Sequence, residues 1–289
     1  MMTLRSMLFV PADSERKLAK ALDSDADALI LDLEDAVAVS QKPVARAAAA
    51  AFIAKQASES TSKIFVRINP LDSGLALTDL AAVVLPGLTG IVLPKADGAA
   101  DVVRLGHYLD ALEARNGVAS GTVQIVVVAT ETPRAIMSLQ SYAPSIPRLV
   151  ALTWGAEDLS TAVGAISNRE DDGELSPLYV MANALCVCAA AAAGVSAIDT
   201  LYADFRDGPG LAAACRLARR RGFHGKIAIH PDQVSVINEA FSPSNQELAE
   251  ARAIVDAFAA QPAAGAVSIN GVMYDMPHLK QARRTLGLP

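Results

Sequence analysis

The chain has few cysteines, no excess of positive charge and no long apolar run, and each shortage excludes a class of protein. Its three cysteines cannot all pair with one another. Cys186 and Cys188 lie two apart in an apparent helix, where they point to different faces. We therefore interpret the cysteines as buried thiols of a protein in a reducing compartment, rather than as disulfides or metal ligands.

The charge balance is acidic, with a formal net charge of −6 and a pI of about 5.3. No overall positive field is available to attract nucleic acid or an anionic membrane surface. We expect no nucleic-acid partner, and an anionic substrate would need local cations or a metal ion.

The sequence also lacks the marks of a secreted or membrane protein. The apolar run from Met7 to Ala12 contains Pro11 and is followed at once by charged residues, unlike a secretory signal. The longest apolar stretch, Ala184 to Val195, is shorter than the roughly 18 residues that a membrane-spanning helix needs. We expect a soluble, cytoplasmic protein.

What the sequence does have is material for a large core. Of its 289 residues, 52% are hydrophobic and 19% are charged, and the mean hydropathy is +0.30. A single α/β barrel routinely occupies roughly 250 residues. The length therefore predicts one α/β domain with an extension.

Short apolar, β-branched runs alternate with longer helical patterns, which predicts repeated strand–helix units. Several runs are apolar throughout, as expected of strands buried on both faces. The alternation predicts a (β/α)₈ TIM barrel, with an open doubly wound sheet as the alternative. The eight expected strands lie near Ser6–Val10, Ala28–Leu33, Lys63–Ile68, Gly90–Pro94, Val123–Ala129, Leu149–Trp154, Ala197–Ala203 and Lys226–His230.

We place the barrel at residues 1–241 and a C-terminal extension at residues 242–289. The extension begins with a helix-start pattern at Ser242–Asn245 and a helix up to Ala260. Asn270-Gly271 then predicts a hairpin turn, followed by a last helix from about Pro277 to Leu286. Because the extension is too short to bury a core alone, we expect it to pack on the barrel or on a neighbouring subunit.

Several expected strands end abruptly in charged residues. In a barrel these ends meet at one rim, where active sites form. The residues in question are Asp32, Glu34 and Asp35 after the second strand, Arg67 at the end of the third, Lys95 after the fourth, Glu131 after the fifth and Asp158 after the sixth.

Glu131 and Asp158 form the most informative pair. Neighbouring parallel strands lie about 4.8 Å apart, so their ends can place two carboxylates on one ion. Two carboxylates without nearby His or Cys favour a hard cation, and Mg²⁺ leaves coordination positions open for substrate and water. The alternative is that each carboxylate only caps the helix that follows it.

The cations have similar pairs of interpretations. Arg67 ends an apolar strand, so its guanidinium is either aimed at a ligand or paired with the Asp32–Asp35 cluster. Arg16 and Lys20 lie four apart on one helix face, where they could bind phosphates or simply be solvated. Lys95 lies closer to the predicted rim.

One motif is misleading. Gly208 to Ala213 matches G-x-G-x-x-A after a strand, as in dinucleotide-binding proteins. Pro209 removes one amide that such a loop could offer to a phosphate, and the unit comes seventh rather than first. A nicotinamide-dependent oxidoreductase is therefore a minor alternative. The sequence has no G-x-S-x-G elbow, Walker loop or zinc signature.

Taken together in order, the motifs resemble those of the citrate lyase β-subunit and malyl-CoA lyase group, within the HpcH/HpaI aldolase and citrate lyase superfamily. The resemblance covers nearly the whole chain, although Ala12 stands where the family usually has glycine. The matching segments are Leu8–Asp13 with Arg16 and Lys20, Leu31–Val37 with Lys42 and Arg46, Val66–Asn69, Leu93–Lys95, Thr130–Thr132, Trp154–Leu159, Gly222–Lys226 and Ile229–Val234.

The resemblance implies a (β/α)₈ barrel, usually trimeric, with Mg²⁺ on Glu131 and Asp158 and with Arg67 facing the oxygen of an acyl thioester. It also implies that Asp275, in the segment Gly271–Asp275, reaches into a neighbouring subunit's site, although Tyr274 and Met276 differ from the family's pattern. The implied activity is a Mg²⁺-dependent carbon–carbon lyase.

The substrate is left open by the sequence. Citryl, malyl, citramalyl and methylmalyl thioesters differ only in small groups around one carbon, and the carrier is either coenzyme A or an acyl-carrier protein. A thioesterase on the same scaffold and a noncatalytic subunit are the remaining alternatives.

Overall fold

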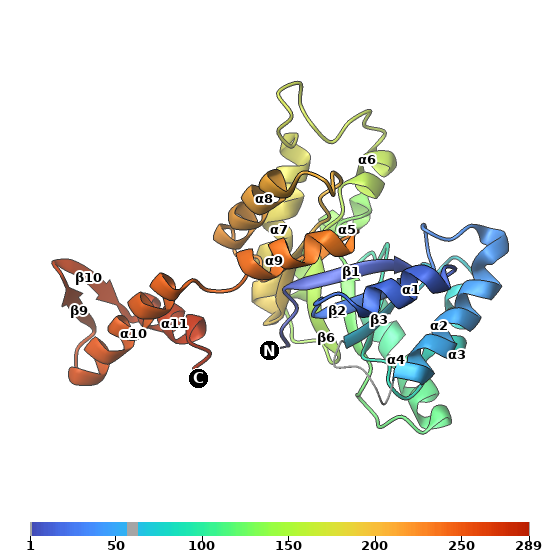
Figure 1. Cartoon of the computed structure of the whole chain (residues 1–289), viewed down its shortest axis with the longest axis horizontal. Coiled ribbons are helices and arrows are strands. Elements are labelled where there is room, and N and C mark those ends of the chain that lie inside the picture. Colours follow the sequence, from blue (N-terminus) through green and yellow to red (C-terminus); the bar gives the residue numbers. More distant parts are fainter. Residues whose placement is uncertain (1, 57–62, 289) are drawn as a thin grey trace. The chain divides into compact units, whose positions relative to one another are not determined.

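Over residues 2–56 and 63–288, which the computed structural model describes, eight parallel strands close into a barrel (Figure 1). Each strand pairs with the next, and β8 pairs with β1. The predicted (β/α)₈ fold is thus confirmed. The strands are β1 (Ser6–Pro11), β2 (Ala28–Asp32), β3 (Lys63–Arg67), β4 (Gly90–Leu93), β5 (Gln124–Val128), β6 (Leu149–Thr153), β7 (Ser196–Asp199) and β8 (Gly225–Ala228).

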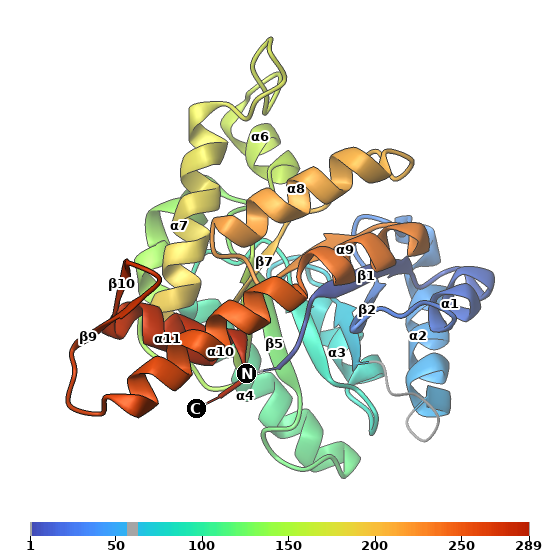
Figure 2. The same ribbon diagram turned by 60° about the vertical axis from the view of Figure 1, so that its left-hand side comes forward.

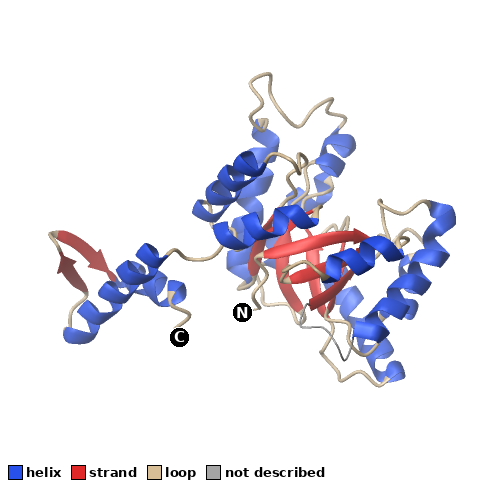
Figure 3. Ribbon diagram, in the orientation of Figure 1, coloured by secondary structure: helices blue, strands red, loops and turns tan. Residues whose placement is uncertain are grey.

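Helices enclose these strands, as Figure 3 shows by colour. Figure 2 places α7 along β7, and the two pack against each other. Short 3₁₀ helices lie at Val39–Gln41, Leu139–Tyr142 and Pro231–Gln233. The helices around the barrel are α1 (Glu15–Leu22), α2 (Lys42–Gln56), α3 (Ala76–Val83), α4 (Ala99–Asn116), α5 (Pro133–Ser138), α6 (Glu157–Val163), α7 (Pro177–Ala193), α8 (Gly208–Arg220) and α9 (Val234–Ala240).

Alternate strand residues serve two separate cores. Side chains such as Ile30, Val126 and Ile227 fill the barrel interior. Their neighbours along the same strands, such as Leu29 and Leu31, pack between the barrel and its helices. Because both faces of each strand are buried, the strands read as apolar runs.

The last two strands are shorter than the sequence predicts, since Thr200–Ala203 and Ile229–His230 lie outside them. The backbone N–H groups of Ile229 and His230 donate to Gln233 Oε1 at 2.8 and 3.2 Å. The apolar pattern therefore extends past the end of β8, because the backbone there already turns into the capped 3₁₀ helix Pro231–Gln233.

The chain divides into two compact units, Met1–Phe241 and Ser242–Pro289. The second contains α10 (Asn245–Ala260), the antiparallel pair β9 (Ala266–Ile269) and β10 (Val272–Asp275), and α11 (Met276–Thr285). Asn270 and Gly271 both have positive φ, 51° and 81°, as the predicted Asn-Gly turn requires. The expectation that the extension is too short to bury a core of its own needs correction, because it contains a small buried cluster: Phe258, Val267 and Leu279.

Two further expectations concern the surface. In the described part of the chain, no helix is long and apolar enough to span a membrane. Cys186 and Cys188 do point to different faces of α7, but Cys188 is exposed, so the prediction of three buried thiols is wrong for that residue.

Candidate active site

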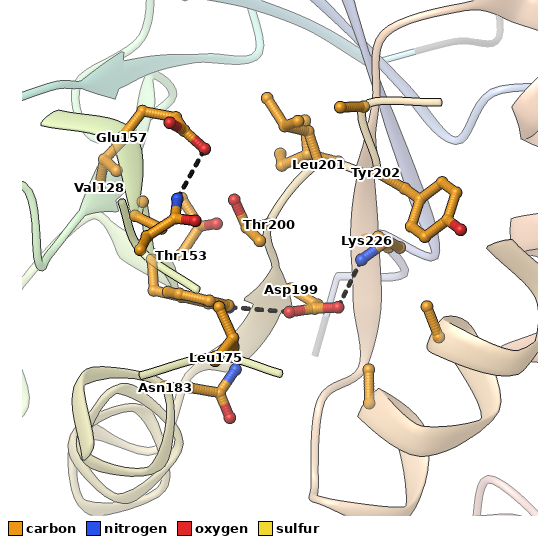
Figure 4. Close-up of a pocket in the computed structure, with 18 of the residues that line it drawn as sticks. Val128, Thr153, Glu157, Leu175, Asn183, Asp199, Thr200, Leu201, Tyr202 and Lys226 are labelled. Atoms are coloured by element: carbon orange, nitrogen blue, oxygen red, sulfur yellow. Dashed lines mark hydrogen bonds and ion pairs between the residues drawn. The ribbon is translucent and has the colours of Figure 1, made fainter. Parts of the chain in front are cut away.

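The carboxyl ends of the strands surround a cavity of about 750 Å³. Its walls include Arg67, Glu131 and Asp158, three of the residues that the sequence singles out. Inward-facing residues of β2, β4, β5 and β8 give part of the lining an apolar surface. The buried polar residues Thr153, Asn183, Asp199 and Lys226 line it as well. Figure 4 shows a part of the lining, including Val128, Thr153, Asn183, Asp199 and Lys226. The cavity therefore joins charged groups at the rim to an apolar floor in the barrel.

Glu131 follows β5 and is only 4% exposed. Its Oε2 accepts the backbone N–H of Lys95 at 2.6 Å, and Lys95 adopts a positive φ of 50° in this conformation. Burial raises the pKa of Glu131 to about 8, and the nearby carboxylates of Glu34 and Asp158 add to this effect. Among the described residues, Oε1 has no hydrogen-bond donor, so one oxygen of a buried carboxylate is open toward the cavity.

Asp158 lies in the first turn of α6, and its side chain is 36% exposed. The loop before it is fixed to Glu131's loop, because Gly155 N–H donates to Thr130 Oγ1 at 3.0 Å. A Cβ atom at position 155 would lie 3.3 Å from Glu131 Cγ, so glycine allows the close approach. The two carboxylates are therefore held by two loops that are fastened together.

Arg67 is the last residue of β3, and its guanidinium contacts two carboxylates. Its Nε and Nη2 donate to the two oxygens of Asp32 at 2.8 and 2.6 Å, and Nη1 lies 3.0 Å from Glu34 Oε2. Its guanidinium also lies 4.5 Å from the centre of the Phe9 ring. Burial alone would lower the pKa of Arg67, but these partners raise it, so the group stays charged. The predicted pairing with the Asp32–Asp35 cluster is confirmed, and the paired guanidinium also lines the cavity.

Lys95 links the acidic residues across the rim. Its Nζ donates to Glu34 at 2.6 Å and to Asp35 at 3.0 Å, and it lies 3.2 Å from Asp158 Oδ1. Burial opposes the charge of Lys95, but the bond to Glu34 and its other partners raise its pKa. Burial also disfavours the charged form of Glu34 and so raises the pKa of this carboxyl. The carboxylates of Glu34, Asp35 and Asp158 thus stabilise a positive charge at the position of the Lys95 ammonium group.

A buried lysine fixes the loop that carries these acids. Lys42 Nζ donates to the backbone oxygens of Leu33 and Glu34 at 2.8 and 2.9 Å, and to Asn69 Oδ1 at 2.7 Å. The amide of Asn69 in turn donates to Asp79. These hydrogen bonds therefore hold the backbone at Leu33 and Glu34, and with it the acidic residues of the rim.

The donor chemistry fits a hard divalent cation. Carboxylates outnumber the two cations at the rim, and Glu131 Oε1 and Asp158 both face the cavity. No group of three or more His, Cys, Asp or Glu side chains suitable for a metal occurs within the described residues. Mg²⁺ does not require one, because it is commonly held by one or two carboxylates together with water and substrate oxygens.

The structure brings together Asp32, Glu34, Asp35, Arg67, Lys95, Glu131 and Asp158. It does not bring Arg16 and Lys20 to the cavity, because both are exposed on α1 and neither lines it. Asp275 belongs to the second unit, where it is exposed and its Oδ1 lies 2.5 Å from His278 Nδ1. This contact lowers the pKa of Asp275.

Sequence reasoning missed three residues of the site. Phe9 and Thr153 are inward-facing strand residues, and Gly155 permits the contact between the two loops. A hydroxyl interrupting the apolar run Leu149–Trp154 was a usable signal for Thr153. Phe9 carried none, since an aromatic residue in a buried strand is ordinary.

The G-x-G-x-x-A motif is a helix cap. Asp207 accepts the N–H of Gly210 at 2.9 Å and the hydroxyl of Tyr202 at 2.6 Å. A Cβ atom at Gly210 would meet these two side chains at 1.9 and 2.3 Å. The glycine therefore admits its own cap, and nothing in this contact serves a dinucleotide.

Comparisons with known proteins identify the family of the chain. The chain is 32% identical to the citrate lyase subunit beta of Haemophilus influenzae, covering 98% of this chain and 95% of that protein. It is 33% identical to the human mitochondrial citramalyl-CoA lyase, covering 98% and 85%. The structure of CitE from Mycobacterium tuberculosis in complex with magnesium, acetoacetate and coenzyme A superposes with a TM-score of 0.79 at 33% identity, covering 99% and 98%. The family model for HpcH/HpaI aldolase/citrate lyase matches residues 5–231, and the chain belongs to this family.

Proposed function

We propose that this chain is a Mg²⁺-dependent carbon–carbon lyase acting on a 3-hydroxy-3-carboxyacyl thioester of coenzyme A. The observation that carries the proposal is the placement of Glu131 and Asp158 on two fastened loops, facing one cavity with Arg67. The names of the relatives support the reaction class, and the magnesium and coenzyme A complex of CitE supports the cofactor and the carrier.

Glu131 and Asp158 would hold the metal ion. A magnesium ion held there would supply Lewis acidity to the substrate oxygen on the carbon that becomes the keto group. Lys95 N–H keeps one Glu131 oxygen occupied and leaves the other free for this role. The Nζ of the same lysine, now close to Asp158, would retreat toward Glu34 and Asp35.

Cleavage breaks the C2–C3 bond of the substrate. The hydroxyl on C3 loses its proton and becomes a carbonyl, and the bonding electrons pass to the thioester as an enolate, which then gains a proton at C2. Arg67 is the fixed charge for the enolate oxygen, because Asp32 and Glu34 hold its guanidinium at the cavity wall. Charge that develops only in the transition state is where a preorganised cation is most effective.

We assign the proton transfer to Asp275 of a neighbouring subunit in a homo-oligomer, which the family resemblance suggests is a trimer. The contact with His278 lowers the pKa of this exposed carboxyl, so it is ionised near neutral pH. An ionised carboxylate enters the cleavage reaction as the acceptor of the hydroxyl proton.

Arg16 and Lys20 are the proposed contacts for the phosphates of coenzyme A. Both lie on the exposed face of α1, directly after β1, whose carboxyl end is at the rim. They form no ion pair with any described residue, so both side chains are available to anions.

The test is an assay of citryl, malyl, citramalyl and methylmalyl thioesters, each with Mg²⁺ and with an excess of chelator. We expect an acyl thioester and a keto acid, formed only with the metal. Release of free coenzyme A without a keto acid would instead establish a thioesterase, and turnover that persists with chelator would contradict the metal assignment.

A further inference from the structure

Thr153 presents a buried hydroxyl to the cavity. It is the last residue of β6 and is 3% exposed, and it lines the cavity near the rim (Figure 4). Among the residues that the structure describes, no group forms a hydrogen bond with its Oγ1. By contrast, the hydroxyl of Thr130 on the neighbouring loop is bonded to Gly155. A buried hydroxyl normally has a hydrogen-bond partner, so the unpaired hydroxyl of Thr153 needs an explanation.

The surroundings of Thr153 offer no partner from within the barrel. In the strand register, Thr153 pairs with Val128 of β5 and with Ile198 of β7. Among the other inward-facing strand residues that line the cavity, Ile30, Val92, Val126 and Ile227 are apolar, and Arg67 is already paired with Asp32 and Glu34. Valine at position 153 would match this floor in shape and polarity, so the hydroxyl serves nothing in the fold itself.

The position of Thr153 links it to one half of the substrate. The chain after β6 leads to Asp158 in the first turn of α6, and the chain after Val128, the register partner of Thr153, leads to Glu131. A group held by these two carboxylates would therefore lie at the ends of β5 and β6, in the same cavity as the Thr153 hydroxyl. In the proposed function, that group is the half of the substrate that leaves as the keto acid.

The floor also restricts what the carbon bearing the hydroxyl can carry. A second carboxylate placed among these apolar side chains would be buried without a partner, which is strongly unfavourable. The buried cations of the cavity are already paired, Arg67 with Asp32 and Glu34, and Lys226 with Asp199 at 2.5 Å. Arg169 and Arg221 also line the cavity, but they are exposed.

We propose, on the basis of the proposed function, that Thr153 determines specificity for the keto-acid half of the substrate. Its hydroxyl forms a hydrogen bond with an oxygen of that half. The apolar floor around it accepts hydrogen or methyl on the carbon bearing the hydroxyl, but not the carboxymethyl group of a citryl thioester, which would bring in a second carboxylate. Malyl and citramalyl thioesters are thus favoured over citryl thioesters.

The experiment compares Thr153→Val, which removes only the hydroxyl, with Thr153→Ser, which keeps it. Kinetics of malyl, citramalyl and citryl thioesters are measured with Mg²⁺, and calorimetry gives the affinities of glyoxylate and pyruvate. Thr153→Val should lower kcat/KM and the keto-acid affinity on the order of 10- to 100-fold, the usual worth of a hydrogen bond to a charged group. Thr153→Ser should stay within a few-fold of wild type.

Thermal unfolding separates this role from a structural one. Because the hydroxyl has no partner in the described chain, Thr153→Val should keep or raise the Tm while activity falls. Unchanged keto-acid affinity and kcat/KM in Thr153→Val would overturn the role of the hydroxyl. A wild-type preference for the citryl thioester would overturn the role of the floor.

Failure of the proposed function gives a different result, because the wild-type protein itself would then release no keto acid from any thioester. Failure of the Thr153 assignment leaves the wild type active and appears only in the variants or in the order of preferred substrates.

Discussion

Glu131 combines near-complete burial with acidic neighbours, and both features oppose its ionisation. Its pKa is raised to about 8, chiefly by burial. Below that pH, the metal-free carboxyl holds a proton that a bound cation must displace. Without metal, Glu131 is therefore protonated at neutral pH, and the fold does not have to bury an unpaired negative charge.

This leads to a prediction about metal affinity. The apparent affinity for Mg²⁺ should rise with pH, by as much as about tenfold per unit for one displaced proton, and should level off above about pH 8. Glu131→Gln should abolish binding and remove the pH dependence with it. Calorimetry across this range tests both. The matched control is Glu157→Gln, since Glu157 also lines the cavity but is exposed and bonded to Asn168; pH-independent binding to the wild type would contradict the assignment.

Arg67 is predicted to act in the transition state. Arg67→Lys keeps the charge but loses the fork that Asp32 holds through two nitrogens. We expect kcat to fall on the order of 100-fold while KM changes much less, as for a lost electrostatic contact to a developing oxyanion. Steady-state kinetics measure the two constants. Arg46→Lys is the control, because Arg46 is similarly buried against Asp79 but does not line the cavity. An unchanged kcat would make Arg67 purely structural.

Sequence reasoning reached the charged residues of the site because parallel strands put their carboxyl ends at one rim. Arg67, Glu131 and Asp158 each interrupt an apolar run, so each was visible. The backbone N–H of Lys95 that fixes Glu131 was not, because a left-handed conformation at a lysine has no signature in a residue pattern. Residue patterns therefore do not predict contacts that depend on the backbone conformation of a loop.

At the level of elements, the starts of helices were easier to predict than the ends of strands. The pattern Ser242–Asn245 predicts a helix start, and within it the Ser244 side chain accepts the N–H of Glu247 at 3.2 Å. The N–H of Ser244 in turn donates to Glu247 Oε2 at 2.7 Å. The end of β8 was placed too late, because a strand ends where its N–H groups leave the ladder. For Ile229 and His230 that point depends on Gln233, three or four residues further on.

Glu113 shows how a helix can be tied to the barrel wall. This fully buried residue of α4 accepts the N–H groups of Gly121 and Val123 at 2.9 and 2.7 Å, and Arg148 Nη1 at 2.8 Å. Burial alone would raise its pKa, but the bonds to Arg148 and the two backbone groups lower it below the ordinary 4.5. The carboxylate therefore closes the turn between α4 and β5.

Replacing this carboxylate should destabilise the protein. We expect Glu113→Gln to lower the free energy of unfolding by about 2–4 kcal/mol at neutral pH, since it removes one partner of a buried charged group. The lowered pKa means that the stabilisation is fully present above pH 4.5 and is lost as the pH falls through the folded-state value, so wild type and variant should converge in acid. Denaturant titrations at several pH values measure this.

Asp110 provides the control, because it contacts the same Arg148 while its side chain is 56% exposed. Asp110→Asn should cost less than about 1 kcal/mol, as exposed ion pairs usually do. Equal losses for the two variants would show that Arg148, rather than the buried turn, is the stabilised group.

At the level of the molecule, the second unit is small for an independent fold. Among its described residues five hydrophobic side chains are buried, and two of these are alanines. Val272, Met273 and Met276 around Asp275 are exposed by 54, 68 and 45% in the single chain. A unit of this size is marginal by itself, and apolar groups beside an acidic residue are typical of a surface that associates. These features support a neighbouring subunit as its partner.

The last prediction is that Asp275 completes the site of another subunit. Asp275 precedes α11 and is bonded to His278, so a purely structural role as a helix cap is the alternative. Asn is an equally good cap, so Asp275→Asn should preserve the Tm while lowering kcat on the order of 10²–10⁴-fold, the usual scale of general acid–base catalysis. When inactive Asp275→Asn and inactive Arg67→Ala protomers are mixed under conditions of subunit exchange, activity should return, because some sites then combine an intact rim with an intact Asp275. Native mass spectrometry confirms that mixed oligomers form. Mixed oligomers without activity would place Asp275 in the site of its own chain or outside the reaction altogether.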